Sequence, residues 1–196
     1  SSNGDVTGNR GNGDAWVVKL ALSGAVVWTK CYGGAEYDEA RDVIEMNDGN
    51  FVFAGYTRSS DGDLSINYGS ADAWFAKVNV LDGTVMWSQT YGGSGADYMY
   101  ALQKTSDPLI SIVASGSTGS PNDYNVTGNH GATDVWVVLL EDGNGILTSA
   151  KCFGGSGFDG FARSSIQVTN DQGYFITTHS STANGDVTSA YGNSDY

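Results

Sequence analysis

The chain has 196 residues, of which 22 are acidic and 9 are basic, and its formal net charge at pH 7 is −13. This charge repels phosphate backbones and anionic membrane surfaces, so we expect no nucleic-acid partner. No stretch approaches the roughly 18 apolar residues that a membrane span requires, so we expect no membrane span either.

In chain order, the sequence predicts short strands rich in aromatic and β-branched residues, each bounded by turn residues. No window has a sustained apolar stripe at helical spacing, so the predicted fold class is all-β. A pair of glycines, such as Gly33 and Gly34, separates the second and third strands of each group of four. The predicted strands cover residues 15–20, 25–30, 42–46, 51–56, 74–78, 85–89, 100–104, 109–114, 136–140, 146–150, 165–169 and 174–178.

One sequence pattern occurs three times and begins a fourth time, in residues 3–16, 61–74, 123–136 and 184–196. If Asp14, Asp72, Asp134 and Asp195 are equivalent, the periods are 58, 62 and 61 residues. Four antiparallel strands in about 60 residues are typical of one β-propeller blade. We therefore expect three four-stranded blades and the start of a fourth, with boundaries at 1–60, 61–122, 123–183 and 184–196.

All five tryptophans occupy repeat-equivalent positions. Trp16, Trp74 and Trp136 fall on the first strand of a period, and Trp28 and Trp87 fall on the second. A large aromatic residue at a fixed strand position is more typical of a core between blades than of a ligand platform. The sequence therefore predicts that Trp16, Trp74 and Trp136 are buried between neighbouring blades.

A propeller normally closes with about 4–8 blades, so three blades do not form a ring alone. The sequence begins and stops inside the same loop of the pattern, which indicates an excerpt of a longer repeat protein. The alternatives are self-association of three-blade units, or an open stack whose ends are covered. We expect the chain on its own to associate rather than to stay a monomer.

The two cysteines, Cys31 and Cys152, occupy the same position in periods one and three, where period two has Thr90. Equivalent positions two blades apart lie beyond the roughly 7 Å Cα distance that a disulfide allows. We therefore predict two free thiols, and no spacing indicates a zinc or haem site.

The loop before each first strand is a candidate calcium site. In period two, Asp61, Asp63 and Ser65 stand at places 1, 3 and 5 and Asp72 stands at place 12, the spacing at which an EF-type loop supplies oxygen ligands. The alternative is a turn shaped by side chains that bond backbone amides without an ion, because place 12 is not Glu and the flanking elements are strands. The weaker equivalents are Asn3, Asp5, Thr7, Asp14, Asp123, Asn125, Thr127, Asp134, Asn184, Asp186, Thr188 and Asp195.

A second carboxylate, at Asp38, Asp97 and Asp159, follows each pair of glycines. Because it recurs in every period, we interpret it as a loop-shaping device, whereas an active site is usually asymmetric. His130 and His179 belong to no recognisable catalytic motif. The sequence predicts no catalytic residue and no cofactor other than the candidate calcium ion.

A family resemblance rests on three consecutive stretches of period two. They are the string from Asp61 through Gly69 to Trp74, the Gly-x-x-x-Trp of Gly83 to Trp87, and Tyr91-Gly92-Gly93. The sequence resembles the tandem β-propeller repeats of large secreted or surface-anchored bacterial proteins of the Bacteroidota type, over essentially the whole chain. The Gly-x-x-x-Trp motif is also similar to quinoprotein-type propeller blades, but period three has Ser149 at the tryptophan position. The first resemblance implies an extracellular repeat region attached to other modules.

We therefore expect a non-enzymatic binding or adhesion module with a glycan or protein ligand, located outside the cell or on its surface. Its further partners would be more blades of the same chain or other copies of it. The alternatives are a purely structural spacer and part of an extracellular propeller enzyme that acts on polysaccharide.

Overall fold

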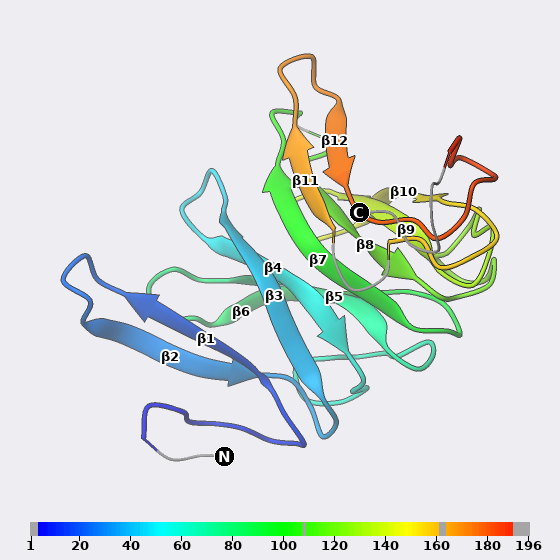
Figure 1. Cartoon of the computed structure of the whole chain (residues 1–196). Helices are drawn as coiled ribbons and strands as arrows, with labels where there is room; N and C mark the ends of the chain where they lie inside the picture. Colours follow the sequence, from blue (N-terminus) through cyan, green and yellow to red (C-terminus); the bar gives the residue numbers. More distant parts are fainter. Residues whose placement is uncertain (1–3, 108, 161–163, 190–196) are drawn as a thin grey trace.

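The computed structural model describes residues 4–107, 109–160 and 164–189, and this part of the chain contains only strands and loops (Figure 1). All of its sheets are antiparallel, which confirms the predicted all-β class. The strands are β1 (Ala15–Leu20), β2 (Val26–Tyr32), β3 (Asp38–Glu45), β4 (Phe51–Thr57), β5 (Asp72–Val78), β6 (Val85–Tyr91), β7 (Asp97–Lys104), β8 (Ile112–Thr118), β9 (Asp134–Leu140), β10 (Leu147–Phe153), β11 (Ser165–Val168) and β12 (Tyr174–Thr177).

The strands form two complete sheets between two half-sheets. The complete sheets have the strand orders β3-β4-β5-β6 and β7-β8-β9-β10, and the half-sheets are β1-β2 and β11-β12. The expected grouping, with a four-stranded sheet starting near each of Trp16, Trp74 and Trp136, is therefore wrong by half a period. Each complete sheet crosses an expected boundary, at 60/61 or at 122/123.

Two connections explain this shift. The acidic loop after β4 brings β5 back alongside β4, in an unbroken register from Phe51↔Val78 to Thr57↔Asp72. The pair of glycines after β2 instead carries the chain out of its sheet, so that β3 begins the next one. The acidic loop is therefore a connection within a sheet, and the glycine pair is the connection between sheets.

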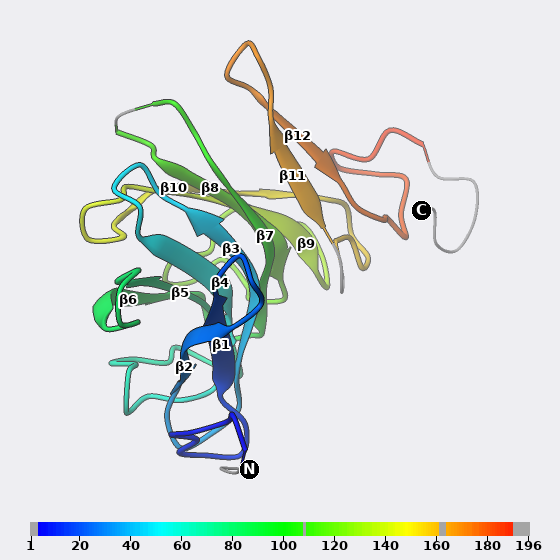
Figure 2. The same cartoon turned by 90° about the vertical axis from the view of Figure 1, so that its left-hand side faces the viewer.

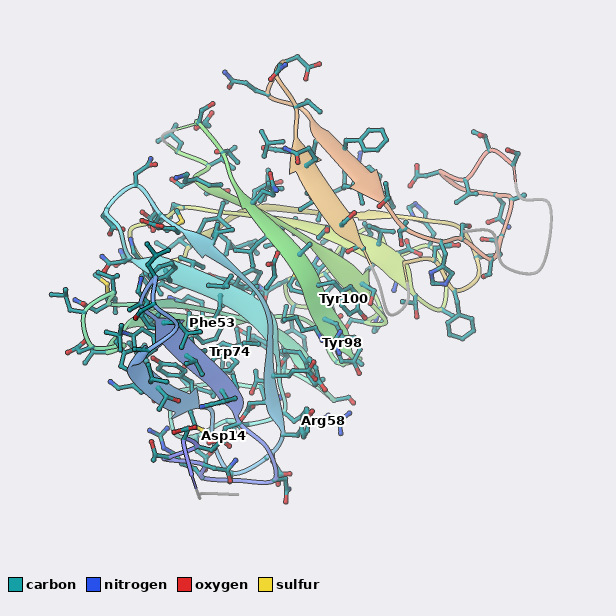
Figure 3. The ribbon with its side chains drawn as sticks, turned by 60° about the vertical axis from the view of Figure 1, so that its left-hand side comes forward. Asp14, Phe53, Arg58, Trp74, Tyr98 and Tyr100 are labelled. Atoms are coloured by element: carbon teal, nitrogen blue, oxygen red, sulfur yellow. The ribbon has the colours of Figure 1, made fainter. Side chains whose placement is uncertain are left out.

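The sheets stack face to face in chain order. One face of the β3–β6 sheet, with Phe53 and Trp74, packs against Ala15 and Tyr32 of the first half-sheet. The Phe53 and Trp74 rings meet edge to face, with centroids 5.0 Å apart, in the region labelled in Figure 3. Figure 2 shows the succession of sheets from β1-β2 to β11-β12.

The same stacking repeats at the next two interfaces. The other face of the β3–β6 sheet, with Val52 and Phe75, packs against Met99 and Trp136 of the β7–β10 sheet. The far face of that sheet contacts Ile166 of the second half-sheet. Each complete sheet thus has two apolar faces, which explains why its strands do not show a simple alternation of polar and apolar residues.

The tryptophan prediction is confirmed in part. Trp74 and Trp136 are fully buried, but 48% of Trp16 is exposed. Trp74 lies on β5, which has a strand on each side, whereas β1 pairs only with β2 in the described part of the chain. Trp16 therefore lacks the neighbour that buries Trp74.

Cys31 and Cys152 are both buried and free, as predicted. Burial and the nearby Asp134 raise the pKa of Cys152 to about 12, which keeps this thiol protonated. Within the described residues, no helix has the length and apolar character of a membrane span.

Candidate functional site

A β-bulge shapes the start of both complete sheets. The β3–β4 register shifts between Ala40 and Asp42, and the β7–β8 register shifts between Met99 and Ala101. The residue inside each shift is Arg41 in β3 and Tyr100 in β7. Bulges redirect a side chain out of the regular alternation, and here they redirect one at the same place in two successive sheets.

The two redirected side chains meet. The Arg41 guanidinium lies 4.7 Å from the centroid of the Tyr100 ring, 4.9 Å from that of Tyr56 and 5.7 Å from that of Tyr98. These distances are within the range of cation–π attraction. Tyr98 and Tyr100 lie next to each other on β7 in Figure 3.

Further contacts extend this group. The Tyr56 and Tyr98 rings meet edge to face at 4.9 Å, and Tyr37 stacks on Tyr56 at 5.9 Å. The Glu39 carboxylate accepts a hydrogen bond of 3.1 Å from Nε of Arg41 and one of 3.4 Å from the Tyr37 hydroxyl. We call the group Tyr37, Glu39, Arg41, Tyr56, Tyr98 and Tyr100 the Arg41–tyrosine cluster.

The cluster combines a fixed charge with partly accessible rings. Burial of the guanidinium disfavours its charge, but Glu39 and Tyr100 outweigh this effect and raise the pKa of Arg41. Burial and the Glu39 charge raise the pKa of Tyr56 to about 12, so its hydroxyl stays protonated. The Arg41 side chain is 27% exposed and Tyr37 is 41% exposed, so a ligand can reach both.

The cluster is asymmetric, although the frame that carries it is repeated. Asp38 and Asp97 are equivalent, so Glu39 and Arg41 of β3 correspond to Tyr98 and Tyr100 of β7. Tyr56 corresponds to Ser117, whose Oγ lies 3.1 Å from the Tyr100 hydroxyl. Residue identity therefore changes from one repeat to the next at these inner positions.

The frame itself is a repeated hydrogen-bond network on the carboxylates of Asp38, Asp97 and Asp159. Asp97 accepts hydrogen bonds from Gly93 N at 2.7 Å, Ser120 Oγ at 2.7 Å and Thr118 Oγ1. The corresponding bonds recur at Asp38, with Gly34, Thr57 and Ser59, and at Asp159, with Gly155, Ser180 and Thr182. These bonds confirm the predicted loop-shaping role.

The candidate calcium residues at places 1 and 3 also bond backbone amides. Asp61 accepts a hydrogen bond from Ala35 N at 2.8 Å, and Asp63 accepts one from Gly33 N at 3.1 Å. Asp63 also forms a 2.8 Å ion pair with Arg10. The same bonds occur at Asp123 and Asn125, and at Asn184 and Asp186, so each acidic loop holds the preceding pair of glycines.

The place-12 residues have a different environment. Asp14, Asp72 and Asp134 each accept a hydrogen bond from the amide four residues earlier, and each has a buried Oδ1 without a hydrogen-bond partner among the described residues. Burial, together with the nearby charge of Asp97, raises the pKa of Asp72 to about 6. The carboxylate is therefore costly to ionise where it lies.

The loop residues differ in their exposure to solvent. The place-5 residues Thr7, Ser65, Thr127 and Thr188 are exposed, as is Asp5, whereas Asp72 and Asp134 are buried. In residues 4–107, 109–160 and 164–189, no three His, Cys, Asp or Glu side chains are grouped to hold a metal ion. Asn3 and Asp195 lie outside the described residues. The calcium site stays a prediction, and the observed bonds favour the turn interpretation.

The sequence reasoning missed Arg41, Tyr98 and Tyr100 as site residues. Spacing could not reveal them, because the bulge that turns Arg41 and Tyr100 toward each other has no motif. The available signal was the comparison of repeats: the carboxylates recur at equivalent positions, whereas Arg41 is replaced by Tyr100. Comparison of the chain with protein-family models and with curated proteins finds no match.

Proposed function

We propose that the stacked sheets are successive blades of a β-propeller, and that the chain is a non-enzymatic module that binds a glycan through the Arg41–tyrosine cluster. Support for the propeller comes from four-stranded antiparallel sheets that stack face to face in chain order. On this arrangement β3 and β7 are neighbouring inner strands, in agreement with their mutual contacts.

The observation that carries the binding proposal is the position of Arg41 against three tyrosine rings with part of its surface exposed. Tyrosine presents an apolar ring face and a polar hydroxyl at low entropic cost, which suits the mixed apolar and polar surface of a sugar ring. Arg41 supplies several fixed donors and Glu39 supplies acceptors for hydroxyl groups.

The difference between repeats supports recognition at this place. The buried carboxylate network is copied into every repeat and so accounts for folding. The cluster residues, in contrast, stand at positions that carry different residue types in successive repeats. A structural requirement common to all repeats does not explain these differences. Binding without catalysis fits the cluster, since the raised pKa values of Arg41 and Tyr56 keep both side chains protonated.

The resemblance to secreted and surface-anchored bacterial repeats supports a location outside the cell or on its surface, and the net charge of −13 disfavours contact with anionic membranes. Cells that produce the protein offer a direct test of location. Antibody labelling of intact cells, with and without external protease, should detect the chain outside the cell. Detection only after lysis would contradict an external location.

A glycan array tests the binding proposal. We expect the wild-type chain to bind a defined set of glycans, and Arg41→Ala and Tyr37→Ala to lose that binding while they keep the wild-type circular dichroism spectrum. Phe158→Ala is the matched control, because Phe158 is an exposed aromatic residue at the position of the third repeat that corresponds to Tyr37. An array with no wild-type binding, or with equal binding by Arg41→Ala, would favour the structural spacer.

A further inference from the structure

The two half-sheets at the ends of the described chain are complementary. In each complete sheet, the strand before the acidic loop pairs with the strand after that loop. Thus β4 pairs with β5, and β8 pairs with β9. By its place in the repeat, β12 corresponds to β4 and β8, and β1 corresponds to β5 and β9. Among the described residues, β12 and β1 each lack the strand that their equivalents have on that edge, and they lie at opposite ends of the stack (Figure 2).

Residues on these two end sheets are exposed where their equivalents are buried. Trp16 and Leu20 are 48% and 53% exposed, whereas Trp74 and Val78 at the same places in β5 are fully buried. Phe175 on β12 is 63% exposed, whereas Val52 and Val113 at the same place are fully buried.

The inner strand of the first complete sheet repeats this contrast. Val43 on β3 is 53% exposed, whereas its equivalent on β7, Leu102, is 2% exposed. Leu102 packs within the cluster that β3–β6 and β7–β10 share. The exposed surface at each end therefore has the composition of a surface that, inside the molecule, another sheet covers.

We propose that β12 of one copy pairs with β1 of a second copy, so that β11-β12 and β1-β2 together make a complete four-stranded sheet. The register follows from β4–β5 and β8–β9, in which Thr57 faces Asp72 and Thr118 faces Asp134. Ser180 takes the place of these threonines because it donates the equivalent hydrogen bond to Asp159. The register is then Tyr174↔Leu20, Ile176↔Val18 and Ser180↔Asp14 of the partner copy.

This pairing covers the exposed residues on both sides. Trp74 and Val78 pack toward the preceding sheet, β1-β2. By the same geometry, Trp16 and Leu20 of one copy pack toward the β7–β10 sheet of the other copy. Val52 packs toward the following sheet, β7–β10. By the same geometry, Phe175 packs toward the β3–β6 sheet of the partner copy, where Val43 is exposed.

For a molecule made of these 196 residues, the number of sheets favours two copies as the closed form. Each copy supplies two complete sheets and two half-sheets, so two copies that join at both ends make six complete sheets. This number lies within the usual range of about 4–8 blades, and three copies would exceed it. A head-to-tail contact that closes in this way gives β1 and β12 of each copy the kind of partner strand that β5 and β4 have.

Light scattering after gel filtration gives the first test. We expect a particle of twice the 20.5 kDa chain mass that persists over a wide dilution series. Phe175→Asp should convert it to monomer, because it places a charge in the proposed interface. Leu81→Asp is the control, since Leu81 is 80% exposed on a turn outside the interface, and it should leave the particle intact.

A disulfide tests the register without relying on a disruptive variant. Val17 and Thr177 lie directly opposite each other across the proposed contact, where Cα distances of about 4.5–5.5 Å permit a disulfide. The variant Val17→Cys/Thr177→Cys is therefore made in a Cys31→Ser/Cys152→Ser background. Oxidation should give a covalent two-copy species, whereas Val27→Cys with Thr177→Cys, which places one thiol on β2, should not. A monomeric wild type, a larger assembly, or equal cross-linking of both pairs would overturn the proposal. The ligand tests on Arg41 do not depend on this outcome.

Discussion

At the scale of single residues, the buried carboxylates hold the connections between the sheets. Asp97 is fully buried and accepts hydrogen bonds from the backbone of Gly93 and from the hydroxyls of Thr118 and Ser120. Removal of one buried acceptor leaves each of its donors unsatisfied, and each such donor costs about 1–3 kcal/mol. Asp97→Ala should therefore lower the free energy of unfolding by about 3 kcal/mol or more.

Denaturant titration followed by tryptophan fluorescence checks this expectation. Asp82→Ala is the control, because Asp82 is exposed in a turn and bonds only Thr84 within its own loop. It should change the free energy of unfolding by less than about 1 kcal/mol. Equal losses in Asp97→Ala and Asp82→Ala would contradict the structural role of the repeated carboxylate.

A buried lysine joins the two complete sheets. Lys77 Nζ on β5 lies 2.8 Å from Asp48 and 2.7 Å from Asp142, which belongs to the turn after β9. The lysine side chain is only 6% exposed, so removal of its charge leaves two carboxylates without their partner. Lys77→Ala should lower the free energy of unfolding by about 1–3 kcal/mol at pH 7. This is less than the loss of a fully buried ion pair, because both carboxylates reach solvent.

The pH dependence of this cost has a defined sign. Partial burial disfavours the Asp48 charge, but hydrogen bonds from Lys77 and Asn50 outweigh it and lower the Asp48 pKa to about 2. Its stabilising contribution is therefore present above about pH 4 and is lost as the pH falls through about 2. The difference in melting temperature between wild type and Lys77→Ala should shrink over this interval, whereas Lys151→Ala, at an exposed lysine, should show little difference at any pH.

At the scale of strands, the bulges depend on a glycine in the neighbouring strand. A Cβ atom on Gly116 of β8 would lie 1.8 Å from the Tyr98 carbonyl oxygen, and one on Gly55 of β4 would lie 1.9 Å from that of Glu39. These are backbone contacts, so a larger residue would push the strands apart and move the bulged residue. The glycines thus hold the strands that position the Arg41–tyrosine cluster.

Gly116→Ala should therefore destabilise the protein by about 1–3 kcal/mol and weaken glycan binding, because overpacking of this size forces the backbone to shift. Gly143→Ala is the matched control, since a Cβ atom there would meet only the end of the Glu141 side chain, at 3.7 Å. Thermal unfolding of both variants checks the prediction. If Gly116→Ala melts at the wild-type temperature, the close approach of the strands is not a constraint.

The strands were predictable from the sequence, but their partners were not. All twelve predicted strand positions contain a strand of the structure, because turn residues and β-branched runs are local signals. Sheet membership depends instead on which loop reverses the chain, and both the acidic loop and the glycine pair have the composition of turns. The cluster was missed for the same reason, since the redirected positions of Arg41 and Tyr100 arise from register shifts.

At the scale of the whole molecule, backbone amides donate hydrogen bonds to the acidic loops, which favours closure of these loops without calcium. We expect the melting temperature to be the same with calcium and with chelator. Asp63→Ala should lower it under both conditions, because Gly33 N and Arg10 lose their acceptor. An ion bound only by the folded form would add about 2.7 kcal/mol at a hundredfold excess over Kd. A rise with calcium in the wild type that is absent from Asp63→Ala would establish the calcium clip instead.

The central claim is that a repeated frame presents one asymmetric recognition surface, the Arg41–tyrosine cluster. The most direct measurement is calorimetric titration of the best array glycan into wild type, Arg41→Ala and Lys151→Ala, where Lys151 lies over the Phe153 ring at 4.7 Å, outside the cluster. Arg41→Ala should weaken binding by about tenfold or more, equivalent to about 1.4 kcal/mol, and Lys151→Ala should bind as the wild type does. Unchanged affinity in Arg41→Ala, or an equal loss in both variants, would contradict the claim.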